Sequence, residues 1–269
     1  MNSPAVSRPP HTAEDALAAL EALADPSRAL HSARFFKTGP GEYGEGDVFW
    51  GITVPRTREV ARAYRDLSHD EIAVLLSHPV HEVRVCGVVI LTEQFKRLKA
   101  TPDRVTAFDF YVRAVRAGQV NNWDLIDISA PTFGTLLVDS RIEPVPLIEP
   151  VEIPRIEPVE IPLIEPVEIL TQLAVADSMW ERRLAVLLTF AFIRVGQFEL
   201  TLMLADMLLA DRQDLMHKAV GWMLREVGKR NPDVLRAFLE DNLRAMPRTT
   251  LRYAIEKFPE AERRRWLTR

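Results

Sequence analysis

The stretch Asn121-Asn122-Trp123-Asp124-Leu125-Ile126-Asp127 lies near the middle of the 269-residue chain. Its apolar residues and the turn signals around it predict a helix, in which Trp123 and Asp127 are four residues apart and neighbours on one face. A carboxylate can stabilise a developing positive charge or hold a water molecule, and an aromatic face attracts cations. The pair therefore indicates a site for a cationic partner. The alternative is that Trp123 is a core residue and Asp127 a solvated one.

Helices are predicted on both sides of this stretch. Pro55 suits a first helical position, and Ser68 with Glu71 has the spacing of a capping box. Thr101 begins another helix, which Gly118 is expected to end. The sequence has no valine-rich alternating run with hairpin turns. It therefore predicts an all-α fold.

The N-terminal part has a different character. Residues 1–12 predict a disordered tail, and helices are expected at about 13–23 and 27–36. The glycine-rich segment 39–47 interrupts the periodicity and predicts a loop. Its three acidic residues would repel phosphate, which argues against a phosphate cradle. We expect a structural turn there, or a flap beside a ligand groove.

A low-complexity segment at 142–168 interrupts the single helical domain that we expect over residues 13–269. Ile-Glu-Pro begins at 142, 148, 156 and 164, and the seven prolines of the segment favour an extended, polyproline-like excursion over a helix. The segment carries a net charge of -6, so the total of -4 leaves +2 for the remainder. We expect an insertion between two helices that can be deleted without loss of the fold. The alternative is an interaction arm that mimics or repels DNA.

Composition argues against several classes of protein. No run of about 18 apolar residues could span a membrane, and no apolar signal region lies at the N-terminus. Cys86, the only cysteine, is expected to be inert core, and we expect a cytoplasmic monomer. His78 and His81, separated by Pro79, predict polar loop residues and not zinc ligands. We expect neither a metal nor a cofactor.

The segment 215–230 predicts an amphipathic helix with a cationic stripe. Lys218, Trp222, Arg225 and Lys229 fall within roughly 60° of one another, mostly opposite the apolar positions. A tryptophan among cations suits a groove for a phosphate backbone with one aromatic contact. The alternative is a basic rim around a partly buried indole.

The helix expected to begin near Trp180 and to run to Ile193 is apolar nearly all round. Arg183 and Arg194 fall on one stripe of it, so they should project into a groove or pair with a neighbouring element. A structural ion pair and a phosphate contact are both open at this point.

A weak repeat connects three of the predicted helices. A basic residue precedes a small one by three positions in Arg84/Gly87, Arg182/Ala185 and Lys218/Gly221. Small residues let helices approach closely, and a recurring basic position is typical of stacked helix pairs whose repeats share one exposed face. The pattern favours HEAT-like repeats without giving their number.

Four segments together resemble the AlkD-like DNA alkylation-repair family. They are 36–41 with the glycines at 44 and 46, 121–127, 180–183 and 217–226. The likeness runs from about residue 27 to the C-terminus, outside the insertion. It implies a right-handed superhelix (solenoid) of HEAT-like helix pairs that holds duplex DNA containing alkylated bases and excises cationic N3- and N7-alkylated purines.

By this resemblance Trp123, Asp127 and Trp222 match the family's active-site positions and Arg183 its groove arginine, while Phe35 falls where some members have a tyrosine. The expected activity is that of a DNA glycosylase. The alternatives are a non-catalytic DNA-binding or scaffold protein of the same family, and a protein-interaction solenoid. The residues expected to bind DNA are Arg182, Arg183, Arg194, Lys218, Arg225 and Lys229.

Overall fold

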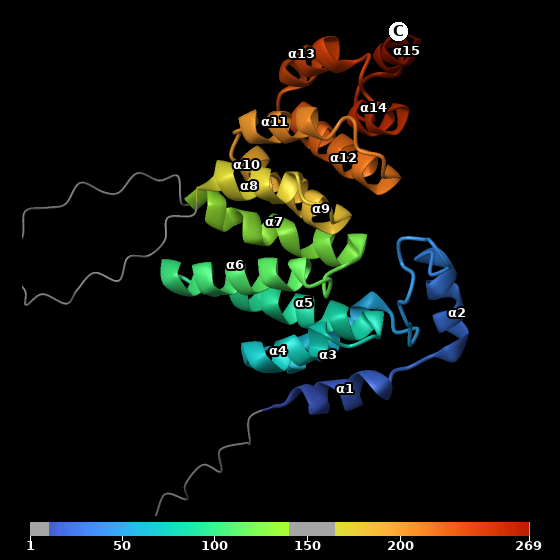
Figure 1. Ribbon diagram of the computed structural model, residues 1–269, viewed down its shortest axis with the longest axis vertical. Helices are drawn as coiled ribbons and strands as arrows, with labels where there is room; N and C mark the ends of the chain where they lie inside the picture. The colour runs from blue at the N-terminus through green and yellow to red at the C-terminus, as the bar shows by residue number, and fades with distance from the viewer. Residues whose placement is uncertain (1–10, 140–164, 269) are drawn as a thin grey trace, which may run out of the picture. The chain divides into compact units, whose positions relative to one another are not determined.

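The computed structural model describes residues 11–139 and 165–268 (Figure 1). Those residues form helices and loops without a β-strand, and Val48 and Val80 make an isolated parallel bridge. The chain divides into two compact units, Met1–Ser129 and Ala130–Arg269, and the division falls inside one helix. The all-α prediction is confirmed.

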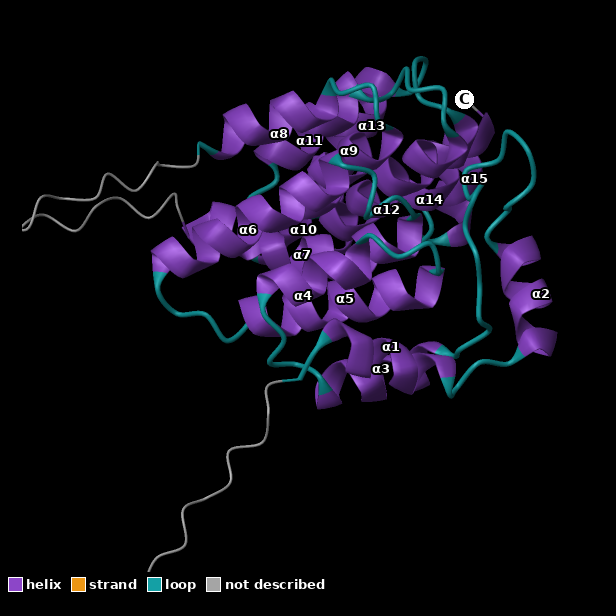
Figure 2. Ribbon diagram, turned by 60° about the horizontal axis from the view of Figure 1, so that its bottom comes forward, coloured by secondary structure: helices purple, strands orange, loops and turns teal. Residues whose placement is uncertain are grey.

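The first unit is built around a buried helix, α5. Most side chains of α5 are buried because α3 and α4 both pack against it, as Figure 2 shows. The helices of this unit are α1 (Ala13–Glu21), α2 (Pro26–Phe35), α3 (Val54–Ala63), α4 (His69–Leu76), α5 (His81–Phe95), α6 (Thr101–Arg116) and the first turns of α7 (Trp123–Asp139).

Helix caps account for several of these boundaries. Thr12 and Asp15 form a reciprocal capping box, so Thr12 belongs to the start of α1 and the predicted tail of residues 1–12 is too long; residues 1–10 lie outside the described part. The hydroxyl of Ser68 accepts the Glu71 amide, as predicted. The Glu71 carboxylate, however, accepts the Ala13 amide, and thereby connects α4 to α1.

The loop between α2 and α3 is held by a carboxylate from α5. Glu82 is buried and accepts the backbone amides of Trp50, Gly51 and Ile52 at 2.8 to 3.2 Å. Gly51 has a φ of 78° and its α-carbon lies close to the backbone of α2, so a side chain has no room there. The predicted loop at 39–47 is confirmed, and this anchoring fixes where its far end lies.

The second unit centres on α12, which packs against α9, α13 and α14. In the described part of the chain, no helix combines the length and the apolar character that crossing a membrane requires. The helices of this unit are α8 (Pro166–Ala174), α9 (Met179–Leu188), α10 (Phe190–Arg194), α11 (Glu199–Met207), α12 (Asp214–Arg230), α13 (Pro232–Asn242), α14 (Arg248–Ala254) and α15 (Glu260–Thr268).

The predicted insertion at 142–168 ends too late. Residues 140–164 lie outside the described part, but α8 already begins at Pro166, which is buried. Proline is compatible with the first helical position because the amide that it lacks has no partner within the helix there. The prediction that prolines exclude a helix is therefore wrong for 166–168.

The helix expected from 180 to 193 is two helices. Thr189 interrupts it between α9 and α10, and its hydroxyl donates to the Val186 carbonyl at 2.6 Å, a local bond that competes with helical pairing. At the same place Gly134 of α7 approaches the Leu188 carbonyl so closely that a β-carbon would lie 2.2 Å from it. The interruption therefore coincides with a close approach between α7 and the end of α9.

The weak repeat is confirmed in one respect and wrong in another. A β-carbon on Gly87 would meet Leu76 at 3.0 Å, and one on Gly221 would meet Tyr253 at 2.6 Å, so both small residues lie at close helix contacts. The basic residues of the repeat, in contrast, do not lie on a common exposed face. Arg84 is 6% exposed and the Arg182 side chain 17%, because each pairs with a carboxylate inside its own unit.

Candidate functional site

Trp123, the first residue of α7, is half-buried against an aromatic cluster. Its indole stacks on the Phe36 ring at 5.6 Å between centroids and 19° between planes, and the edge of Phe35 lies 6.1 Å away. Phe36 in turn stacks on Phe49 at 5.1 Å. Two segments of the first unit, the end of α2 and the loop before α3, thus support the orientation of the indole, which stays partly exposed.

A buried ion network lies directly beside this cluster. His81, the first residue of α5, contacts carboxylate oxygens of Asp124 at 2.8 Å and of Asp47 at 3.3 Å. Arg84, one turn along α5, donates to the other oxygen of Asp47 and to the Asn121 side chain. These contacts join the loop after α2, the start of α5 and the start of α7.

Asn122 completes the connection to α7. Its side chain is buried, donates to Asp47 Oδ2 at 3.0 Å and accepts the Trp123 backbone amide at 2.8 Å. An oxygen on that amide satisfies one of the donors that the first turn of a helix leaves without a partner. The network therefore sets the residue at which α7 begins, and with it the direction of Trp123.

The network also determines the charge states inside it. Burial disfavours the His81 imidazolium, but hydrogen bonds to Asp124 and Asp47 outweigh burial and raise the pKa of His81 to about 9. Burial likewise opposes ionisation of Asp47, yet hydrogen bonds from His81, Arg84 and Asn122 leave its pKa below the usual value. At neutral pH the cluster thus contains a cationic histidine between two carboxylates.

Asp127 lies one turn after Trp123 and is half-buried. The same stretch of α7 is attached to α6, because the buried Tyr111 hydroxyl shares a 2.6 Å hydrogen bond with Ser129. Burial raises the pKa of Tyr111, and the negative charge of Asp127 raises it further. The predicted helix and the one-turn spacing of Trp123 and Asp127 are confirmed; their chemical role stays a prediction.

Trp222 and Arg183 lie in the second unit. Trp222 is half-buried on α12, and its ring centroid is 6.3 Å from that of Phe190. Arg183 is only 4% exposed, and its Nη1 donates to the Leu215 carbonyl at 2.6 Å. A backbone carbonyl of the second unit thus holds the guanidinium, and the role of Arg183 as a groove arginine stays a prediction.

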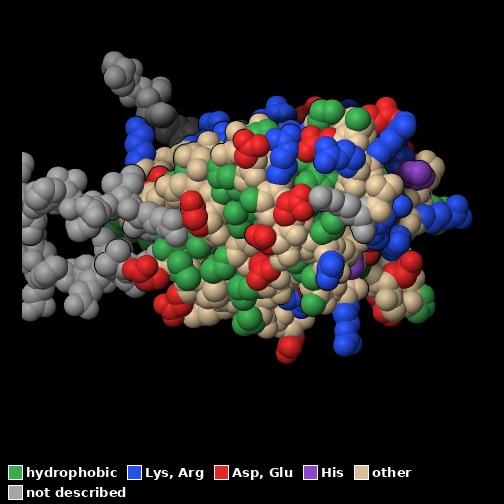
Figure 3. All heavy atoms as spheres, turned by 90° about the horizontal axis from the view of Figure 1, so that it is seen from above, with side chains coloured by type: hydrophobic (Ala, Val, Ile, Leu, Met, Phe, Trp, Pro, Cys, Tyr) green, Lys and Arg blue, Asp and Glu red, His purple; other side chains and the backbone are tan. Residues whose placement is uncertain are grey.

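The predicted cationic stripe of α12 is present, but carboxylates accompany its cations. Lys218 pairs with Asp214 at 2.7 Å, Lys229 pairs with the buried Glu226 at 2.8 Å, and Arg225 pairs with Glu256. Figure 3, which looks onto this end of the chain, shows basic and acidic side chains interspersed. Sequence periodicity placed the cations on one stripe without revealing that Glu256, just after α14, and two carboxylates of α12 itself pair with them.

The remaining two predicted cations differ from each other. Arg182 donates to Asp211 at 2.6 Å and to the carbonyls of Ala176 and Asp177, so its guanidinium is held within the second unit. Its contact with DNA stays a prediction. Arg194, at the end of α10, is exposed. It has the accessibility that a phosphate contact requires.

The predicted residues therefore fall into two groups. Trp123 and Asp127 share one helix face in the first unit, whereas Trp222 and the six predicted cations belong to the second unit. A common site for both groups stays a prediction.

Sequence reasoning missed the ion network. The prediction that His81 is a polar loop residue is wrong, since it is 2% exposed and begins α5. Its partners Asp47 and Asp124 are 34 and 43 residues away in sequence, and no local pattern connects them. The available signal was the run of polar residues around Trp123, which a solvated loop would also have.

The described residues were also compared with the requirements of a metal site and of a reactive thiol. They contain no group of three or more histidine, cysteine, aspartate and glutamate side chains arranged to hold a metal ion. Cys86 is buried in α5, and burial raises the pKa of its thiol to about 12. The thiol is thus protonated and enclosed, as the sequence predicted.

Comparison with known proteins gives one family. A family model described as "DNA alkylation repair enzyme" matches residues 16–149 and 163–258, and it leaves out 150–162 in the repeat segment. A solved structure described as "Predicted DNA alkylation repair enzyme from Enterococcus faecalis" has a TM-score of 0.64 and 16% identity, covering 88% of this chain and 97% of that one. At that identity the structural likeness concerns the fold alone. Comparison with curated proteins finds no match.

Proposed function

Because the chain belongs to the DNA alkylation repair enzyme family, we propose that it is a DNA glycosylase. Its substrate is duplex DNA carrying purines alkylated at N3 or N7, and the reaction is hydrolysis of the N-glycosidic bond. The proposed architecture is a right-handed superhelix of HEAT-like helix pairs with the DNA on its concave face. The enzyme uses no cofactor.

The observation that carries the proposal is the half-buried carboxylate of Asp127 one turn from an indole whose orientation is fixed. An alkylated purine is already cationic, so it leaves as a neutral base without protonation by the enzyme. As the C1′–N bond lengthens, positive charge develops on the sugar, and a carboxylate stabilises that charge. Asp127 also orients the water that adds to C1′, and the proton of that water passes to solvent.

The aromatic residues have a matching role. The faces of Trp123 and Trp222 pack against the electron-poor deoxyribose, where a cation–π attraction contributes about 1 to 2 kcal/mol once water is excluded. Lys218, Arg225, Lys229 and Arg194 contact phosphates, the first three by exchanging carboxylate partners. Arg182 and Arg183 support the helices around α12 through the contacts described above.

The test is base release from a duplex containing 7-methylguanine. We expect Asp127→Asn to lower the single-turnover rate roughly 10²- to 10³-fold, the size typical of removing an electrostatic catalytic group, with duplex affinity nearly unchanged. Asp109→Asn is the matched control, because Asp109 is an exposed aspartate on α6 that pairs with Arg113. It should behave as wild type.

Equal rates for Asp127→Asn and wild type would remove Asp127 from the mechanism. Duplex binding by wild type without any base release would favour the second candidate, a non-catalytic DNA-binding or scaffold protein. The carboxylates beside the cations of α12 are the observation in favour of that candidate, since they weaken the field available to phosphates.

A further inference from the structure

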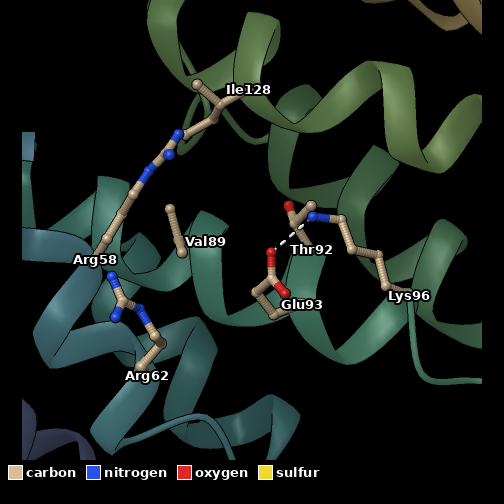
Figure 4. Close-up of a pocket in the computed structure, with 7 residues that line it drawn as sticks. All are labelled: Arg58, Arg62, Val89, Thr92, Glu93, Lys96 and Ile128. Carbon is tan, nitrogen blue, oxygen red and sulfur yellow. Dashed lines mark hydrogen bonds and ion pairs between the residues drawn. The ribbon is translucent and has the colours of Figure 1, made fainter. Parts of the chain in front are cut away.

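A hollow of about 270 Å³ lies on the first unit between α3, α5 and α7. Figure 4 shows Arg58 and Arg62 from α3 on one side and Lys96 from α5 on the other. Val89 lies between them, and Ile128 of α7 closes one end. Ile128 directly follows Asp127 in sequence, so α7 contributes to this hollow the residue next to the proposed catalytic one.

The charges around this hollow are not balanced. Arg58 and Arg62 lie one turn apart and exposed on α3, and among the described residues neither has a carboxylate within ion-pair distance. Lys96 pairs with Glu93 at 2.7 Å, the one carboxylate in the lining. Two arginines with free forks therefore face a space that is partly apolar. This differs from α12, where carboxylates accompany the cations of the stripe.

We propose that this hollow binds a backbone phosphate of the DNA strand together with its adjoining deoxyribose. The arginine forks match the geometry of phosphate oxygens and donate charge-assisted hydrogen bonds to them. Val89 and Ile128 provide the apolar contact that a sugar requires. The inference rests on the proposed function, and adds to it a phosphate contact made by the same unit that carries Trp123 and Asp127.

The first experiment compares two double variants that each remove two positive charges. Arg58→Ala/Arg62→Ala removes the two arginines that line the hollow without a carboxylate partner. Arg56→Ala/Arg65→Ala removes exposed arginines from the same helix and the turn after it, which pair with Glu59 and Asp66 and do not line the hollow. The readout is the affinity for a fluorescein-labelled duplex over a range of salt concentrations, with thermal melting as a check on folding.

We expect the hollow variant to bind roughly tenfold to a hundredfold more weakly, the range for lost charge-assisted hydrogen bonds. A plot of log affinity against log salt concentration should also be less steep for this variant, with a slope smaller by about 1, the value for one phosphate contact. The control variant should lose much less. Equal losses in both variants, or no loss in either, would overturn the inference.

The second experiment maps the phosphate contact on the DNA, and compares the wild-type protein with Arg58→Ala/Arg62→Ala once melting has shown that the variant is folded. Single phosphates of the duplex are replaced in turn by uncharged methylphosphonates. We expect one position to weaken wild-type binding strongly and to have little effect on Arg58→Ala/Arg62→Ala. A uniform weakening at all positions would contradict a defined phosphate site. Base release is measured separately, so loss of the glycosylase proposal and loss of this one give different results.

Discussion

A single histidine determines much of the local geometry around Trp123. His81 lies between two carboxylates and against the rings of Phe36 and Phe49, at 4.7 and 4.9 Å between centroids. A buried imidazolium is favourable here because both of its ring N–H groups donate hydrogen bonds to carboxylate oxygens. The same residue would be costly if either carboxylate were removed, since a buried charge would then lack its partner.

This arrangement predicts a specific dependence of stability on pH. The pKa of His81 is raised to about 9 in the folded protein, against about 6.5 in an unfolded chain. Its stabilisation is therefore complete below about pH 6.5 and is lost as the pH rises to about 9, by an amount of up to about 3 kcal/mol. Urea unfolding between pH 6.5 and 9.5 measures this loss.

The variants His81→Gln and His31→Gln provide the comparison. His81→Gln should be less stable at pH 7 and should show little further loss toward pH 9. His31→Gln, which changes an exposed residue of α2, should follow wild type. An unchanged pH dependence in His81→Gln would assign the effect to other groups.

At the scale of a helix, α12 shows how small residues set packing distance. Its two buried glycines face different kinds of neighbour. A β-carbon on Gly221 would meet the Thr250 carbonyl at 2.7 Å and Tyr253 Cβ at 2.6 Å, atoms that move only with the backbone of α14. A β-carbon on Gly228 would meet the tip of Leu235 at 2.4 Å, and a side-chain tip can rotate away.

We therefore predict different effects on stability for two similar substitutions. Gly→Ala in a helix interior ordinarily stabilises by about 0.5 to 1 kcal/mol. Gly221→Ala should instead destabilise the protein by about 1 to 3 kcal/mol, because α14 must move. Gly228→Ala should be nearly neutral. Chemical denaturation measures both, and a stabilised Gly221→Ala would show that α12 and α14 are not in such close contact.

For the whole chain, the question is how much of its length the fold requires. The family match omits residues 150–162, and the similar solved structure is covered almost completely by this chain. Deleting 142–168 would remove the first turn of α8 and the buried Pro166. A deletion that spares the helices must therefore end before Pro166.

Deletion of 150–162 should leave stability and base release nearly unchanged. It roughly halves the connection between α7 and α8, and halving a loop changes its closure free energy by only about 0.6 kcal/mol. Because the deleted residues carry net negative charge, duplex affinity should stay the same or rise slightly. An unfolded deletion variant, or one that no longer binds duplex, would show that the repeat segment has a structural or interaction role.

Helix positions and helix ends could be predicted from the sequence alone, because they depend on residues that are close together in the chain. It predicted α1, α2 and α12 to within two residues, the caps at Ser68 and Gly118, and the placement of Trp123 and Asp127 on one helix. These follow from periodicity and from the chemistry of helix ends, which act over about four residues.

Which polar side chains form ion pairs and hydrogen bonds with one another depends on the fold. The carboxylate partners of His81 and Arg182, and the Leu215 carbonyl that Arg183 contacts, lie 29 to 43 residues away, and those separations carry no periodic signal. A basic residue on a helix face has the same pattern whether a distant carboxylate neutralises it, as for Arg225, or leaves it free, as for Arg58. The physical reason is that charge pairing depends on distance in space, which packing sets after the helices have formed.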